Sequence, residues 1–141
     1  MACRLVTLKS ANRCSLRMSA PTARGDHGVL DYTGYSPPVD DDGAWMLQVL
    51  RDCVNRAGIR EVHAHVAQFD GSESPPGFAA VVLIDASHLS AHCYSESGLL
   101  AIDIFTCGDS DPVPLADDIH NMVVEAVPGL ELSGRKRLDR F

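Results

Sequence analysis

The sequence predicts an α+β fold, a two-layer sandwich in which an antiparallel β-sheet packs against two helices on one face. The chain has 141 residues, 45% of them hydrophobic, which suits one domain with a single buried core. Hydrophobic patterns indicate the element order strand, helix, three strands, helix, strand. An apolar run of about 18 residues, long enough to cross a membrane, does not occur.

The first strand and the first helix are bounded by turn and capping residues. Residues 27–32 favour a strand, which the proline pair at 37–38 ends. In residues 45–54, apolar side chains recur at i, i+4 spacing and predict an amphipathic helix. Asp40-Asp41-Asp42 supplies N-cap candidates for this helix, and Ala57-Gly58 ends it.

Three strands are predicted in the middle of the chain. Residues 62–67 alternate as a strand, and residues 70–77, with two glycines and two prolines, form a loop. Residues 78–84 are a nearly continuous apolar strand. A polar connection at 85–98 leads to the third strand, at 99–105.

A second helix is predicted at residues 115–127, and a short last strand around 130–132. Pro128-Gly129 lies just past the end of the helix. The apolar positions that share one helix face are Leu115, Ile119, Met122, Val123 and Ala126.

Charge divides the chain into three parts. Residues 1–24 carry basic but no acidic side chains and predict a disordered extension, whereas residues 135–141 predict a basic, solvated tail. The domain between them, residues 25–134, has three arginines against eighteen carboxylates, which would concentrate cations near it. The net charge of −7 argues against a protein that binds nucleic acid by neutralising phosphates.

The cysteines indicate reduced thiols in the cytoplasm. They are odd in number, form no CxxC pair, and follow no recognisable signal peptide. Together with the histidines they show no spacing typical of a structural zinc site, so no metal site is predicted. The five are Cys3, Cys14, Cys53, Cys93 and Cys107.

Four side chains suited to catalysis follow the strand at 78–84. Ser87 lies at the end of this strand, His92 five residues later, Glu96 four residues beyond that, and Cys107 at the end of the next strand. These residue types serve as nucleophile, base and acid in enzymes. On residue types alone, a polar turn with a surface serine and a buried cysteine is the simpler interpretation.

The order and spacing of these residues, joined to the run Ala101-Ile102-Asp103-Ile104-Phe105-Thr106-Cys107-Gly108, resemble bacterial S-adenosylmethionine decarboxylase, a pyruvoyl-dependent family of polyamine synthesis. The resemblance covers residues 25–130 and implies that family's fold. It is strongest from Gly77 to Gly108 and weaker at Gly25-Asp26-His27 and Asp31-Tyr32.

The resemblance implies a self-processing enzyme that makes its own pyruvoyl group. Ser87 would attack the carbonyl of Ala86, and elimination would then cut the chain into a β-chain, 1–86, and an α-chain, 87–141. His92 would be the base for this elimination. The pyruvoyl group at residue 87 would form a Schiff base with the substrate amine and accept the electrons left when CO2 departs, and Cys107 would return the proton.

The resemblance also implies a substrate and an assembly. S-adenosylmethionine would be converted to its decarboxylated form, the aminopropyl donor for spermidine, by a homodimer of processed protomers. Glu96 would bind the ribose hydroxyls, Phe69 would stack on adenine, and Asp31 stands where the family has a glutamate.

Departures from the family pattern leave two alternatives open. Ala86 replaces a glutamate before the processing serine, Ala79 replaces a serine that helps processing, and the loop at 70–77 is longer than usual. One alternative is a pyruvoyl decarboxylase of a basic amino acid, arginine or ornithine. The other is an unprocessed, non-catalytic homologue that acts as a binding or regulatory subunit.

Overall fold

The structure, a computed structural model, describes residues 24–141 and contains six strands and two helices. The predicted extension at 1–24 lies, apart from Arg24, outside the described residues. The helices are α1 (Asp42–Arg56) and α2 (Val113–Ala126). The strands are β1 (Gly25–Thr33), β2 (Glu61–Phe69), β3 (Gly77–Ile84), β4 (Ser87–Tyr94), β5 (Leu99–Cys107) and β6 (Glu131–Arg140).

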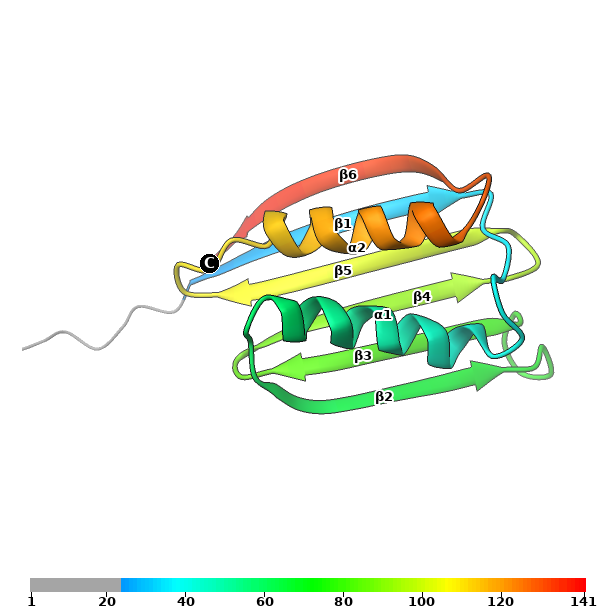
Figure 1. The fold of residues 1–141 in the computed structure, drawn as a ribbon, viewed down its shortest axis with the longest axis horizontal. Helices are drawn as coiled ribbons and strands as arrows, with labels where there is room; N and C mark the ends of the chain where they lie inside the picture. Colours follow the sequence, from blue (N-terminus) through cyan, green and yellow to red (C-terminus); the bar gives the residue numbers. More distant parts are fainter. Residues whose placement is uncertain (1–23) are drawn as a thin grey trace, which may run out of the picture.

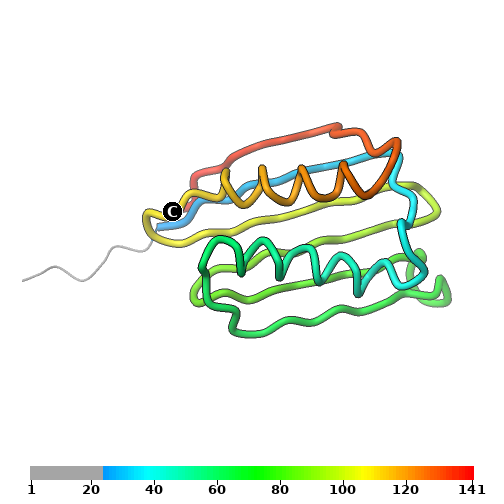
Figure 2. Tube along the Cα trace, viewed as in Figure 1, coloured from blue at the N-terminus to red at the C-terminus, as the bar shows by residue number. Residues whose placement is uncertain are grey.

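All six strands form one sheet in the order β2-β3-β4-β5-β1-β6, and every neighbouring pair is antiparallel. Figure 1 shows both helices on the same face of this sheet, and the chain trace in Figure 2 shows the same two layers. The predicted two-layer α+β sandwich is therefore confirmed.

The predicted polar connection at 85–98 is wrong for residues 87–94, because these form β4 in the middle of the sheet. The side chains of Leu89, Ala91 and Cys93 are buried, and those between them are more exposed, which is the period of a strand. Only one of the buried side chains is large, so the segment lacks the apolar run that marks the neighbouring strands.

The predicted basic tail at 135–141 is also wrong, because residues 131–140 form β6 on the edge of the sheet. Its side chains are almost all exposed, so backbone pairing with β1 holds it in place. Ion pairs add to this ladder: Arg135 contacts Asp117 at 2.6 Å, and Arg137 lies 3.5 Å from the buried carboxylate of Asp26. A strand held by backbone pairing leaves little apolar pattern in its sequence.

The start of α1 follows the predicted capping. The Asp41 carboxylate accepts a hydrogen bond from the backbone N–H of Ala44 at 3.1 Å, as an N-cap residue does. The neighbouring Asp42 is buried and accepts a hydrogen bond from the Tyr35 hydroxyl at 2.9 Å. Burial, followed by this hydrogen bond, raises the pKa of Tyr35 well above its usual range. These contacts attach the chain between β1 and α1 to the helix layer.

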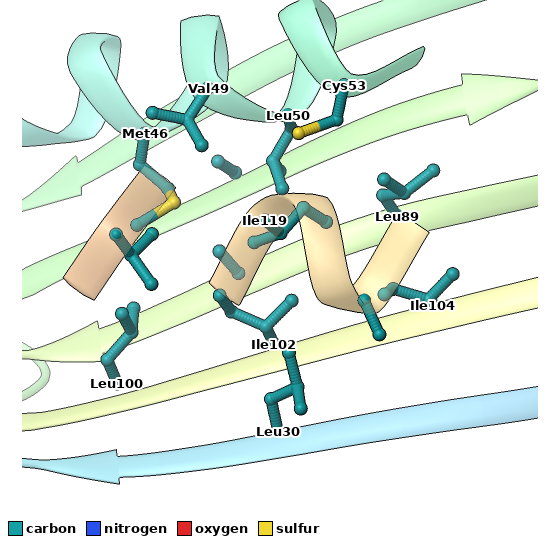
Figure 3. Close-up of a cluster of buried hydrophobic side chains, with 14 of the residues drawn as sticks. Leu30, Met46, Val49, Leu50, Cys53, Leu89, Leu100, Ile102, Ile104 and Ile119 are labelled. Carbon is teal, nitrogen blue, oxygen red and sulfur yellow. The ribbon is translucent and has the colours of Figure 1, made fainter. Parts of the chain in front are cut away.

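The core lies between the helices and the sheet (Figure 3). Leu50 and Cys53 from α1 and Ile119 from α2 meet Ile102 and Ile104 from β5 there, all nearly inaccessible to solvent. Each such aliphatic side chain stabilises the fold by about 1.5–3 kcal/mol through burial. The core therefore fixes β4 and β5, the strands that carry the predicted catalytic residues.

Among residues 24–141, no helix covers the opposite face of the sheet, the open face (Figure 1). It presents the side chains that alternate with the buried ones, including apolar Leu83, Tyr94 and Leu99, which are 41–42% exposed. Within residues 24–141, no helix has the length and apolar character needed to span a bilayer. The open face also carries five of the six histidines, His27, His63, His65, His88 and His92.

Candidate active site

The predicted cleavage site lies in a tight hairpin turn between β3 and β4. Ile84 pairs with Ser87 across the ladder, so Asp85 and Ala86 alone make the turn, and both are exposed. Asp85 has a φ of 43°, in the left-handed region that costs a residue with a side chain about 1–2 kcal/mol. The peptide bond between Ala86 and Ser87 therefore joins a strained turn to the first residue of β4.

The structure brings Ser87 and Cys107 together from strands that lie side by side. The Ser87 hydroxyl oxygen accepts a hydrogen bond from the backbone N–H of Cys107 at 3.0 Å. Both residues are half-buried and line one pocket of about 390 Å³ at this end of the sheet. The remaining lining residues are Gly58, Ile59, Arg60, Ile84, Asp85, Thr106 and Ser110.

His92 does not reach this pocket within one chain. It lies five residues along β4 from Ser87, about 17 Å at the rise of a strand, and the odd spacing places it on the opposite face of the sheet. Its ring stacks against Phe69 (6.3 Å between centroids, 11° between planes) and Tyr94 (5.8 Å, 25°). His92 is thus part of an aromatic group on the open face.

The substrate-binding residues that the resemblance implies also lie away from Ser87. Glu96 is exposed in the turn after β4, at the opposite end of the strand from Ser87, and Phe69 ends β2 on that same side of the molecule. Asp31 is exposed on β1 and pairs with Ala101, which in turn pairs with His92. Asp31 and His92 are therefore two strands apart, about 10 Å.

A second group of side chains lies on the open face, at the same end of the sheet as Ser87 and Cys107. The Phe105 ring is stacked against His88 (5.4 Å, 18°) and meets His27 edge-on (6.3 Å, 86°), and His27 Nε2 lies 3.1 Å from an Asp103 carboxylate oxygen. Burial, followed by the charge of His27, lowers the pKa of His88. These residues have no role predicted from the sequence, although alternation along 99–107 places Asp103, Phe105 and Cys107 on one face.

The other cysteines of the described segment are remote from this chemistry. Cys93 is buried beneath the sheet, on the opposite face from His92, and Cys53 is buried on α1. Desolvation raises the pKa of each thiol to about 12. Residues 24–141 hold no group of three or more His, Cys, Asp or Glu side chains arranged to bind a metal ion.

Comparison with solved structures places the fold. The adenosylmethionine decarboxylase of Aquifex aeolicus superposes on this chain with a TM-score of 0.58, at 24% sequence identity, over 86% of this chain and 91% of that one. This similarity defines the class of fold, a sandwich of the decarboxylase type.

The family follows from the sequence comparisons. The family model for S-adenosylmethionine decarboxylase matches residues 26–126, and the chain belongs to this family. A proenzyme from Geobacillus kaustophilus is 42% identical over 70% of this chain and 77% of its own length. Proenzymes from Parasynechococcus marenigrum (33% identical over 60% of this chain) and Pyrococcus abyssi (29% over 67%) are matched over 63% and 66% of their lengths, so the chain spans just under two thirds of these relatives.

Proposed function

We propose that the protein is a self-processing decarboxylase that converts S-adenosylmethionine to its decarboxylated form, which serves spermidine synthesis as an aminopropyl donor. The observation that carries the proposal is the position of the Ser87 hydroxyl at a strained two-residue turn, in one pocket with Cys107. Free thiols at Cys53, Cys93 and Cys107 support a reducing compartment, the cytoplasm.

Self-cleavage begins with the residues of this turn. Ser87 Oγ adds to the carbonyl carbon of Ala86, the amide bond breaks, and the hydroxyl proton moves to the freed nitrogen, which leaves an ester. Removal of the α-proton of residue 87 expels the Ala86 carboxylate, and water then replaces the nitrogen, which leaves as ammonia. The products are a β-chain, 1–86, and an α-chain, 87–141, that begins with a pyruvoyl group.

The residues around position 87 fit such a group. Ala86 is exposed and outside the ladder, so cutting its bond to residue 87 leaves the pairing of β3 with β4 in place. The Cys107 backbone N–H donates to Ser87 Oγ, the atom that adds to the Ala86 carbonyl and later leaves with its carboxylate, so elimination frees this donor beside the new pyruvoyl group. A pyruvoyl group here supplies an electron sink for decarboxylation, and the Cys107 thiol, in the same pocket, is placed to return a proton to the substrate carbon.

A homodimer completes the site. Ser87 and Cys107 lie at one end of the sheet, whereas Phe69, His92 and Glu96 lie toward the other, and one chain cannot bring the two sets together. Two copies that pack their open faces across a two-fold axis, with strands running in opposite senses, would place the His92 end of one copy over the end of the other where Cys107 faces outward and Ser87 begins β4. Partly exposed apolar side chains on this face support such packing.

The identity of the substrate can be tested at Glu96. We expect Glu96→Gln to lower kcat/KM for S-adenosylmethionine about 10- to 100-fold, because a charged acceptor of hydrogen bonds is worth about 1.5–3 kcal/mol. Release of CO2 would be measured with S-adenosylmethionine, arginine and ornithine. Glu125→Gln, an exposed carboxylate on α2, is the matched control and should leave turnover unchanged. Turnover of arginine or ornithine by the unaltered protein, with none of S-adenosylmethionine, would contradict the proposed substrate.

Ala79 offers a test of the processing machinery. It pairs directly with His92 across the β3–β4 ladder, at the position where the resemblance expects a serine that helps processing. We expect Ala79→Ser to speed self-cleavage several-fold, because it restores a hydrogen-bonding group beside the imidazole. The fraction of cut chain would be followed over time after synthesis, with Ala67→Ser, on the adjacent strand, as control. An unchanged or slower rate would show that alanine at position 79 does not limit self-cleavage.

A further inference from the structure

The turn that carries the proposed cleavage site is held from outside its own hairpin. Asp85 Oδ1 accepts hydrogen bonds from Arg60 Nη2 at 2.6 Å and from Arg60 Nε at 3.2 Å. Arg60 lies in the connection between α1 and β2, twenty-five residues earlier in the chain. The carboxylate of a turn residue is thereby tied to a segment next to the helix layer.

The position of Asp85 determines where the carbonyl of Ala86 lies. The turn has only two residues, so rotation about the backbone of Asp85 moves this carbonyl directly. Asp85 keeps a left-handed φ of 43°, a conformation that residues other than glycine disfavour. On the other side of the cleavage site, the Cys107 backbone N–H holds Ser87 Oγ. Arg60 and Cys107 thus hold the two reacting groups from opposite sides.

Charge gives Arg60 a second effect. Among the described residues that line the pocket, Arg60 is the one cation and Asp85 the one anion. Cleavage would create another carboxylate at Ala86, adjacent to Asp85, and two neighbouring anions repel each other. A guanidinium already bound to Asp85 reduces this repulsion as the new carboxylate leaves.

We propose that Arg60 is a positioning residue for self-cleavage: through Asp85, it holds the turn in the conformation in which Ser87 reacts with Ala86. This inference rests on the proposed self-processing. The pair is largely exposed, at 75% and 57% of the two side chains, so it adds little to global stability. Its effect falls on the turn.

The test is the rate of self-cleavage of Arg60→Ala, followed by intact mass on freshly synthesised chain. We expect a three- to fivefold slower rate, since an exposed ion pair is worth up to about 1 kcal/mol. Asp85→Asn should slow cleavage equally, because asparagine tolerates the left-handed backbone but lacks the charge. The double variant should be no slower than either single variant. High salt should slow the unaltered protein but not Arg60→Ala, because salt screens exposed charges.

Arg51→Ala is the matched control. It removes a similar ion pair, Arg51 Nε to Glu61 at 2.9 Å, from the same part of the chain without touching the turn. Equal cleavage rates for Arg60→Ala and the unaltered protein, or an equal slowing by Arg51→Ala, would overturn the role of Arg60. An unaltered protein that never cleaves would overturn the proposed function as well. Hydroxylamine cuts the ester and therefore reports ester formation separately from the later elimination. If the turn governs formation of the ester, the amount of chain cut by hydroxylamine should also be lower in Arg60→Ala.

Discussion

Ser87→Ala is expected to yield a single uncut chain with no decarboxylase activity. Alanine lacks the oxygen that must add to the carbonyl of Ala86, so neither the ester nor the pyruvoyl group can form. The fold should be retained, because the lost hydroxyl accepts one hydrogen bond at the end of a strand. Such a bond contributes about 0.5–1.5 kcal/mol, well below the stability of an ordinary domain.

An intact mass spectrum under denaturing conditions measures this outcome directly. The unaltered protein should give two chains divided between Ala86 and Ser87, the smaller one beginning with a pyruvoyl group. Ser90→Ala, on the same strand but facing the open side, should be cut like the unaltered protein. Cleavage or decarboxylation by Ser87→Ala would exclude the pyruvoyl mechanism. A single uncut chain from the unaltered protein would point to the non-catalytic homologue.

His92→Ala alone should cleave at least a hundredfold more slowly, since a positioned base contributes about 10²–10⁴ to a proton transfer. The geometry predicts rescue when His92→Ala is co-expressed with Ser87→Ala. In a mixed dimer of the proposed kind, the Ser87 of one chain would meet the His92 of the other, and that site would be complete. About half of the His92→Ala chains should then be cut, if the two variants pair at random.

Tags of different mass would identify which chain is cut in this experiment. The Ser87→Ala chain must stay whole, and the His92→Ala chain must appear as two fragments only in the mixture. A co-expression of His92→Ala with a double Ser87→Ala/His92→Ala variant supplies the control and should give no rescue. Absence of rescue in the first mixture would show that His92 does not act across a dimer of open faces.

The fold was predictable where one side of an element is buried by apolar side chains. The pattern in 45–54 and the run at 78–84 fall in α1 and β3, and the aspartates before α1 supply its cap. The edge strand β6 was not predictable in this way, because backbone pairing with β1 holds it and its side chains remain exposed.

The candidate site was predictable in part. The family resemblance, not the residue types alone, predicted that Ser87 and Cys107 share a site, and in the structure the Cys107 backbone N–H contacts Ser87 Oγ between adjacent strands. The separation of His92 from Ser87 was missed because β4 was not recognised; on a strand, a spacing of five residues means opposite faces. The role of Arg60 could not be predicted from the sequence, because its contact with Asp85 depends on where the connection after α1 passes the hairpin.

The strand order has a consequence for the cut molecule. The fragment 1–86 would contain β1, β2 and β3, and the fragment 87–141 would contain β4, β5 and β6. In the sheet, β1 of the first fragment lies between β5 and β6 of the second. The two fragments are therefore interleaved in one sheet. They can separate only if the hydrogen-bond ladders on both sides of β1 open together. One broken peptide bond leaves a molecule that still behaves as a single folded body.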